Sequence, residues 1–242
     1  GMGQLVDALT ERLRAEGVEI STGTVVDGLD ERRVHLSDGG VVDADAVVLA
    51  GGAASSASLL RPHVPEAANA LEQIPLASTT IVTLAWPQSA FDAAPDSQGW
   101  LQADAGPVSG VTVSSVKFAG RAPGGMVLAR VFVPDKRGPL TEADDDELIA
   151  AVLGHVRPLL GVSGEPALVH ITRWRRTMPT YTVGHLSRVA VVDDALAAVR
   201  PRWAVAGSAL HGVGVPDCVA DGRRQADAVL DAVVMARDRP PG

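Results

Sequence analysis

The sequence predicts an α/β plus α+β fold, in which a discontinuous α/β domain is interrupted by a mainly antiparallel β-sheet domain with helices. Two short apolar runs without a polar face, residues 46–50 and 203–207, are typical of strands buried in a parallel sheet. Longer strand-like segments lie between them, separated by turns rich in proline and glycine. We therefore assign residues 1–74 and 186–242 to the first domain and residues 75–185 to the second.

The start of the chain predicts a helix followed by short strands. Apolar residues recur at helical spacing from Leu5 to Leu13, and Gly17 is a natural stop. Strands are then expected over residues 18–20, 24–26, 33–36 and 41–44. The last two of these segments flank a Ser-Asp-Gly-Gly turn, so we expect them to pair as a hairpin.

The central region predicts long strands and one amphipathic helix. Strands are expected over residues 79–86, 110–118, 126–133 and 167–174. The acidic segment 141–146, of sequence Thr-Glu-Ala-Asp-Asp-Asp, suits a helix N-terminus, and the apolar spacing from Leu148 to Val156 continues that helix. Period-two alternation places Arg130 on one face with Leu128 and Phe132. Because a charge among large apolar groups must be paired or must line a ligand cavity, Arg130 is either a salt-bridge partner or a ligand-binding residue.

Near the end of the chain, a glycine-rich turn over residues 207–215 connects the last strand to a helix with an apolar face from Val219 to Val234. A helix start carries free N–H groups and partial positive charge, which suit an anion or an electron-rich heteroatom. Gly212 and Gly214 would let the backbone approach a flat or phosphorylated ligand. Since such turns are also common structural features, ligand binding and a plain turn are both open interpretations.

Composition excludes several classes of function. The 242 residues carry a net charge of −8, and only 3% are aromatic although 46% are hydrophobic. The chain has no basic excess to neutralise phosphates, so nucleic-acid binding is not expected. The single cysteine excludes a disulfide framework, and the 6 histidines show no metal-ligand spacing. No apolar run reaches the ~18 residues of a membrane span and no signal-peptide pattern is visible, so we expect a cytoplasmic protein, with peripheral membrane association as the alternative.

Four segments of the chain resemble the protoporphyrinogen/coproporphyrinogen oxidases, a family within the flavin-dependent amine oxidase superfamily. These segments are residues 1–9, residues 111–123, Trp174 with residues 178–185, and residues 206–222. The third resembles the family's Trp…Pro-x-Tyr-x-x-Gly-His signature, and the fourth resembles its C-terminal flavin-binding motif. The family's opening Gly-x-Gly-x-x-Gly fingerprint is absent from this sequence. The chain therefore resembles the C-terminal portion of such an enzyme.

This resemblance implies a cofactor, a substrate and partners. The cofactor is FAD, and the reaction is oxidation of coproporphyrinogen III or protoporphyrinogen IX to the porphyrin in haem synthesis, with O₂ as acceptor. The first domain would be the remainder of the FAD-binding domain and the second the substrate-binding domain. The implied partners are the family's N-terminal half or a second copy of the chain. The isolated fragment is expected to be inactive.

The resemblance also implies site residues. The cofactor-binding residues expected are Val25, Val26, Gly207, Gly212, Val213 and Gly214. The substrate-binding residues expected are Arg130 and Tyr181, and no catalytic residue is assigned. Two other functions remain open. Amine or carotenoid-type oxidation would need an aromatic cage at the flavin, for which only Tyr181 is offered, and the absent fingerprint would also suit a non-catalytic binding module.

Overall fold

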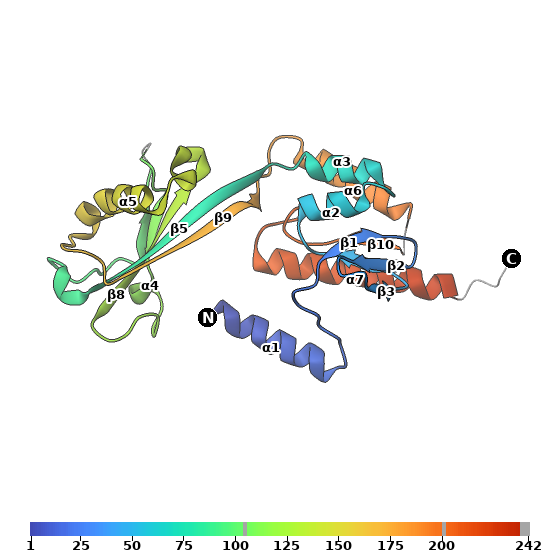
Figure 1. Cartoon of the computed structure of the whole chain (residues 1–242), viewed down its shortest axis with the longest axis horizontal. Helices are drawn as coiled ribbons and strands as arrows, with labels where there is room; N and C mark the ends of the chain where they lie inside the picture. Colours follow the sequence, from blue (N-terminus) through green and yellow to red (C-terminus); the bar gives the residue numbers. More distant parts are fainter. Residues whose placement is uncertain (104–105, 200–201, 238–242) are drawn as a thin grey trace. The chain divides into compact units, whose positions relative to one another are not determined.

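The computed structural model describes residues 1–103, 106–199 and 202–237, and the chain divides into two compact units (Figure 1). The first unit comprises Gly1–Leu71, Val189–Gly207 and Cys218–Gly242, and the second comprises Glu72–Arg188 and Ser208–Asp217. Both ends of the chain therefore contribute to the first unit. The division differs from the boundaries that the sequence predicts, because Ser208–Asp217, which hold most of the glycine-rich turn, belong to the second unit.

The first unit begins with helix α1 (Met2–Ala15), in agreement with the predicted helical spacing. A small antiparallel sheet follows, with strands in the order β1 (Val26–Leu29), β2 (Arg33–Leu36) and β3 (Val41–Asp43). Arg33 lies opposite Asp43, so the predicted hairpin is confirmed. The strand expected over residues 18–20 is wrong, because no neighbouring strand pairs with this segment and it has no regular structure.

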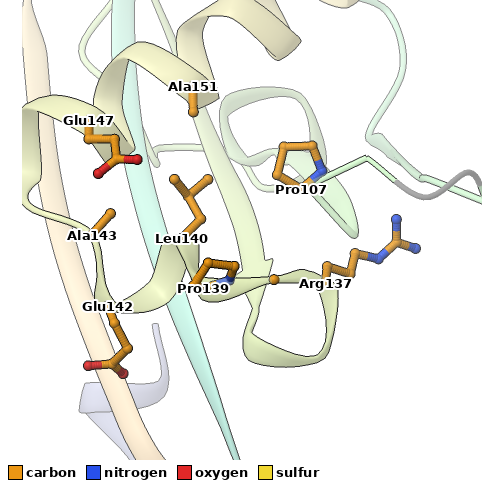
Figure 2. A pocket seen from close by; sticks show the side chains of 9 residues that line it. Pro107, Arg137, Pro139, Leu140, Glu142, Ala143, Glu147 and Ala151 are labelled. Carbon is orange, nitrogen blue, oxygen red and sulfur yellow. The ribbon is translucent and has the colours of Figure 1, made fainter.

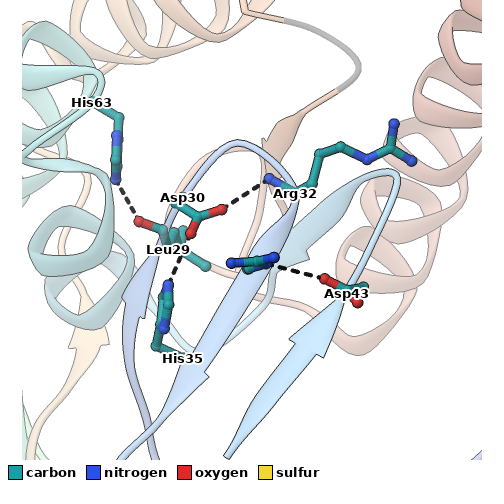
Figure 3. A network of polar contacts seen from close by, with 7 residues as sticks. Leu29, Asp30, Arg32, His35, Asp43 and His63 are labelled. Carbon is teal, nitrogen blue, oxygen red and sulfur yellow. Dashed lines mark hydrogen bonds and ion pairs between the residues drawn. The ribbon is translucent and has the colours of Figure 1, made fainter.

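The β2–β3 hairpin is joined to its surroundings by polar contacts near its ends (Figure 3). The Asp30 carboxylate accepts a hydrogen bond from the backbone N–H of Arg32 at 3.1 Å and lies 3.0 Å from Nε2 of His35. The backbone N–H of Arg32 and then the His35 ring hold the pKa of Asp30 below its ordinary value. On the neighbouring strand, the carbonyl oxygen of Leu29 lies 2.7 Å from Nε2 of His63, which must donate because a carbonyl only accepts.

A parallel pair of strands joins the beginning and the end of the chain within the first unit. Strand β4 (Val47–Leu49) pairs in parallel with β10 (Trp203–Val205). Both strands lie within the two apolar runs that predict strands, although the runs did not specify this pairing. However, Val48 is 40% exposed, so β4 is not buried on both faces. Among the described residues this sheet contains two strands, so each of them is an edge strand. Helices α2 (Ala53–Leu60) and α3 (Pro65–Glu72), which the sequence analysis did not assign, follow β4 in the chain.

The second unit contains a five-stranded antiparallel sheet in the order β6-β7-β8-β5-β9. Its strands are β5 (Leu76–Pro87), β6 (Gly99–Leu101), β7 (Gly110–Val113), β8 (Met126–Pro134) and β9 (Leu168–Pro179). Figure 1 shows β5 and β9 running side by side as the longest strands of this sheet. The strand expected over residues 110–118 is too long, because the chain turns into the short helix α4 (Ser114–Lys117) directly after Val113.

The two faces of this sheet differ in burial. Helix α5 (Asp145–Leu160) covers one face, and its Asp144 cap accepts a hydrogen bond from the Glu147 backbone N–H at 2.8 Å. The core residues on that side include Val82, Leu84, Val127, Ala129, Val131, Leu148, Val152 and Val156. Most of the alternate strand positions, on the opposite face, are half-buried or exposed; Ala85 and Pro134 are the buried exceptions on β5 and β8. The sheet therefore has one closed face that holds the core and one open face that can hold a ligand.

The remaining elements are helices. Short 3₁₀ helices occupy Gln88–Ala90, Asp135–Arg137 and Pro139–Glu142. Helix α6 (His185–Ala197), which the sequence analysis did not assign, follows β9, and the predicted closing helix is α7 (Val215–Arg237). Within the described part of the chain, no helix is long and apolar enough to cross a membrane. The described residues also contain no group of three His, Cys, Asp or Glu side chains that could hold a metal ion.

Candidate functional site

A cavity of about 770 Å³ lies on the open face of the second unit's sheet. This volume is within the range of ~300–1,000 Å³ that is typical of small-molecule sites. The lining residues come from five strands, from the chain beside them and from the glycine-rich turn: Thr79, Ile81, Leu101, Ser109, Thr112, Phe132, Trp174, Thr177, Met178, Pro179, Ser208 and Val213. Most of these side chains are apolar or carry a single hydroxyl, so the cavity suits an apolar ligand with few polar contacts.

Strand register explains why the apolar side chains meet in this cavity. Ile81 lies directly opposite Phe132, and Thr79 lies directly opposite Trp174. Opposed residues of antiparallel strands project from the same face, so these side chains form one continuous surface. Trp174 as a residue is 52% exposed although it lines the cavity. An exposed aromatic ring beside apolar neighbours is well suited to stack on a flat ligand.

The glycine-rich turn reaches this cavity because the preceding motif holds it there. The Tyr181 hydroxyl donates a hydrogen bond to the carbonyl oxygen of Ser208 at 2.6 Å and accepts one from the Gly212 backbone N–H at 2.9 Å. The ring of Tyr181 stacks on His185 with 3.8 Å between ring centroids. His185, which is buried, donates from Nε2 to the carbonyl oxygen of Leu210 at 2.9 Å. Tyr181 and His185 therefore fix the backbone that presents Ser208 and Val213 to the cavity.

The tip of the turn presents one backbone donor between two that are already engaged. The N–H of Gly212 donates to Tyr181, and that of Gly214 donates to the Asp217 carboxylate at 3.2 Å. Asp217 thus reaches back to the residue before α7 in the manner of a capping box. The N–H of Val213 has no hydrogen-bond partner among the described residues. It lies two residues before Val215, where α7 begins, and the partial positive charge of a helix N-terminus favours an electron-rich acceptor nearby.

Close packing around Asp217 explains both glycines of the tip. A Cβ at Gly212, whose φ is +146°, would lie 2.5 Å from Cβ of Asp217. A Cβ at Gly214 would lie 2.8 Å from Oδ2 of the same residue. Gly214 is not among the glycines with positive φ, so a left-handed backbone conformation does not explain this glycine. Its lack of a side chain instead makes room for the Asp217 carboxylate.

The predicted cofactor-binding residues fall into both units. Val25 and Val26 lie at the start of β1 in the first unit, with exposed fractions of 62% and 37%. Gly207 also belongs to the first unit, where its N–H donates to Oδ2 of Asp221 at 2.7 Å. In contrast, Gly212, Val213 and Gly214 belong to the second unit, and Val213 lines the cavity.

The predicted substrate-binding residues have different surroundings. Arg130 lies on the open face of the sheet and is exposed, and its guanidinium carbon is 5.7 Å from the centroid of the Phe132 ring, which lines the cavity. Arg130 is not itself a lining residue, and no ion pair joins it to any residue that the structure describes. The salt-bridge interpretation is therefore not supported for this part of the chain. The Tyr181 hydroxyl is engaged by the backbone of the turn.

A second pocket of about 490 Å³ lies beside α5 in the same unit (Figure 2). Glu142 and Glu147 line one side of it, and the guanidinium of Arg137 extends away from them. That guanidinium donates to the backbone carbonyls of Gln102, Gly106 and Val108 at 2.7, 3.1 and 3.2 Å. Arg137 therefore holds the chain between β6 and β7, and this pocket offers no free cation or aromatic ring to a ligand.

Sequence reasoning did not identify the residues that form most of the cavity wall. Ile81, Thr112 and Phe132 follow the same period-two alternation as Arg130, so alternation marks them as sharing a face once the strands are known. The identity of the open face is a different matter. It depends on which side α5 covers, and no local pattern reveals this.

An open-faced sheet whose apolar cavity meets a glycine-rich helix start is suited to a protein that binds a flat, mostly apolar ligand. The family model of flavin containing amine oxidoreductases matches residues 1–230. Since the match covers nearly the whole chain, the chain belongs to the flavin containing amine oxidoreductase family. The predicted resemblance to this superfamily is thereby confirmed.

Particular relatives within the family are similar to this chain. A coproporphyrinogen III oxidase of Propionibacterium freudenreichii subsp. freudenreichii is 70% identical over 241 residues, which cover 100% of this chain and 46% of the relative. A coproporphyrinogen III oxidase of Mycobacterium tuberculosis is 35% identical, and the match covers 96% of this chain and 50% of the relative. The crystal structure of an Exiguobacterium sp. 255-15 protein assigned as a protoporphyrinogen oxidase is similar with a TM-score of 0.77 at 29% identity, covering 93% of this chain and 51% of that one. The chain spans about half the length of these relatives.

Proposed function

We propose that this chain forms the substrate-holding part of an FAD-dependent oxidase that converts coproporphyrinogen III to coproporphyrin III in haem synthesis. The observation that carries the proposal is the cavity of about 770 Å³, whose apolar wall meets the glycine-rich turn at Val213. A tetrapyrrole is a large, mostly apolar ring system with polar groups at its edge, and this wall offers it aromatic and aliphatic surface. The names of the similar relatives support the choice of substrate.

The residues of the turn fit a flavin. The Val213 N–H has no partner among the described residues and lies two residues before the start of α7, and Val213 lines the cavity. A preorganised N–H in this position would stabilise negative charge that develops on an electron-rich heterocycle. Within the second unit, Gly212 and Gly214 would allow the backbone to approach it. Val25, Val26 and Gly207 of the first unit remain cofactor-binding residues by the family resemblance alone. When bound, FAD would supply the hydride acceptor for successive two-electron oxidations, with O₂ as the final acceptor.

The protein's own contribution is to bind and orient the substrate. Phe132, Ile81 and Trp174 would contact the faces of the macrocycle and exclude water from them. Tyr181 acts as a positioning residue in this proposal, because its hydroxyl holds Ser208 and Gly212 and so places the turn. No general base is assigned, because none of the cavity-lining residues has a titratable side chain in the ordinary pH range.

Amine oxidation is less well supported than porphyrinogen oxidation. An aromatic cage would need a Tyr181 ring that is available to the substrate. The ring instead stacks on His185, and its hydroxyl bonds the turn. No other observation favours an amine substrate over a tetrapyrrole.

A chimeric enzyme tests the proposal. The residues of the Propionibacterium relative that precede its match would be joined to this 242-residue chain, which replaces the 70%-identical part. We expect the chimera to bind FAD and to form fluorescent coproporphyrin III from coproporphyrinogen III, with the relative itself as the positive control. A folded, flavin-containing chimera that leaves coproporphyrinogen III unoxidised would contradict the proposed function.

A further inference from the structure

The open face of the second unit's sheet carries a row of polar side chains beside the cavity. Thr83 of β5 lies directly opposite His170 of β9 on one side and Arg130 of β8 on the other. Arg130 in turn lies opposite Thr112 of β7. Directly opposed residues project from the same face with Cβ atoms about 4.5–5.5 Å apart. These four side chains, which we call the Arg130 row, thus form a continuous polar band across four strands.

The Arg130 row borders the cavity. Ile81 and Phe132, which line the cavity, lie two residues from Thr83 on β5 and from Arg130 on β8. The rise of a β-strand places them about 7 Å from the row. Thr112 belongs to the row and also lines the cavity. The Arg130 guanidinium lies 5.7 Å from the Phe132 ring centroid. A ligand that rests its apolar body on Phe132 would therefore bring its edge to the row.

Arg130 differs from Arg157 and Arg173 of the same unit in having no carboxylate partner among the described residues. Arg173 forms an ion pair in which Nη1 lies 2.6 Å from Oδ1 of Asp145. Arg157 forms another, with Nη2 at 2.7 Å from Oε1 of Glu165. Arg130 has no such ion pair with the described residues. The strand positions that share its face also lack a carboxylate, since the register places threonine, apolar residues, glycine and His170 there. The row therefore offers a cation and hydroxyl groups to a ligand, with no acidic side chain on the same strand positions to neutralise them.

We propose that the Arg130 row binds a carboxylate of the ligand whose apolar body fills the cavity. The inference rests on the proposed function, under which that carboxylate is a propionate at the edge of the tetrapyrrole. A guanidinium binds a carboxylate in a bidentate geometry, with two parallel N–H···O hydrogen bonds. The hydroxyls of Thr83 and Thr112 can donate to the remaining lone pairs of the carboxylate. Coproporphyrinogen III carries a propionate on every pyrrole ring, whereas protoporphyrinogen IX carries vinyl groups on some. The row thus selects for a tetrapyrrole that is carboxylated along the edge facing β8.

Porphyrin binding by the 242-residue chain tests the row directly. Coproporphyrin III, the stable oxidised form, would be titrated into the wild-type chain and the variants Arg130→Met, Arg130→Lys and Thr83→Val. Quenching of tryptophan fluorescence and the shift of the porphyrin absorption band report binding, because Trp174 lies in the cavity wall. Lys136→Met removes one exposed positive charge away from the row and is the matched control. The fully methylated ester of coproporphyrin III, in the same mild detergent, is the ligand without carboxylates.

Loss of a charge-assisted bidentate contact should raise the Kd of Arg130→Met for coproporphyrin III by about tenfold or more. We expect Arg130→Lys to recover part of the affinity, Thr83→Val to lose a smaller part and Lys136→Met to match the wild type. The ester should bind the wild type and Arg130→Met equally. Equal coproporphyrin III affinity in wild type and Arg130→Met, with unchanged melting temperatures, would overturn the row while leaving the proposed function standing. Failure of the wild-type chain to bind coproporphyrin III would overturn both.

Discussion

The Tyr181 hydroxyl accepts a hydrogen bond from the backbone N–H of Gly212 at 2.9 Å, although 31 residues separate them in the sequence. The same hydroxyl donates to Ser208, and the stacked His185 donates to Leu210. The segment after β9 therefore holds the glycine-rich turn at both of its sides. These contacts connect the segment of residues 178–185 with the glycine-rich turn of residues 207–215. The first of these segments therefore positions the turn at the edge of the cavity.

Removing the Tyr181 hydroxyl should destabilise the second unit. Tyr181→Phe keeps the ring on His185 but loses both hydrogen bonds to the turn, and each is worth about 0.5–1.5 kcal/mol net. Because Tyr181 is 40% exposed, water compensates for part of the two lost hydrogen bonds. We therefore expect the free energy of unfolding in urea to fall by about 1–2 kcal/mol. Val183→Ala, at a fully exposed position nearby, is the control and should change stability by less than about 0.5 kcal/mol. An unchanged unfolding free energy for Tyr181→Phe would show that the turn does not depend on this hydroxyl.

The close approach of Gly214 to Asp217 predicts energetic coupling between them. Gly214→Ala would place Cβ 2.8 Å from Oδ2 of Asp217, so the carboxylate must move and its cap on α7 is lost. In the Asp217→Ala background, which lacks that carboxylate, Gly214→Ala should lower the free energy of unfolding much less. We expect a coupling free energy of at least about 0.5 kcal/mol in a double-mutant cycle measured by denaturation.

Gly212 provides the contrasting position in the same turn. Its added Cβ would lie 2.5 Å from Cβ of Asp217, an atom that Asp217→Ala retains, and its φ is +146°. Gly212→Ala should therefore be costly in both backgrounds. If Asp217→Ala relieved Gly212→Ala as fully as Gly214→Ala, the assignment of separate steric causes would be incorrect.

The polar contacts of Asp30 predict a pH dependence in the first unit. Hydrogen bonding from the Arg32 backbone N–H and then from His35 lowers the pKa of Asp30 from its ordinary value of 3.8. A lowered folded-state pKa contributes stability that is present above pH ~4 and is lost as the pH falls through the folded-state pKa. Asp30→Asn should flatten stability against pH in this acidic range, while Asp7→Asn on α1 controls for the lost charge.

An NMR titration of the Asp30 carboxyl group separates the two causes of the lowered pKa. In His35→Phe, the titration midpoint should rise but stay below the ordinary value, because the backbone donor remains and is the larger cause. A midpoint that returns fully to the ordinary value would assign the effect to His35 alone. The side chains involved are exposed enough for these substitutions to leave the fold intact.

Cofactor affinity should depend on residues outside this sequence. The chain contains no Gly-x-Gly-x-x-Gly segment, which is the usual pyrophosphate-binding element of dinucleotide sites. The 242-residue chain mixed with FAD and passed through gel filtration should therefore emerge without the visible flavin absorption, whereas the chimera should retain it. A yellow chain with close to one tightly bound FAD per molecule would contradict this expectation and would place the whole flavin site within these residues.

The sequence by itself determined the order of the main elements and the family. The apolar runs that form β4 and β10, the hairpin of β2 and β3, and the helices α1, α5 and α7 are all visible in local periodicity. Alternation also placed Arg130 on the same face as Phe132. These features are local, because period and turn residues act over a few positions. The motif segments sufficed for the family resemblance because they preserve residue types at fixed spacing.

Only the tertiary structure decided which faces are closed and which contacts the motif residues make. Residues 110–118 were expected to form a single strand, but the chain turns into α4 at Ser114. Tyr181 resembles a ligand-binding aromatic in the sequence, yet its hydroxyl bonds backbone atoms that lie 27 and 31 residues away. Helix α5 covers one face of the sheet and leaves the face of Arg130, Thr83 and Phe132 open. The physical reason is that burial and hydrogen bonding between distant segments depend on packing of the whole unit, which no local sequence pattern encodes.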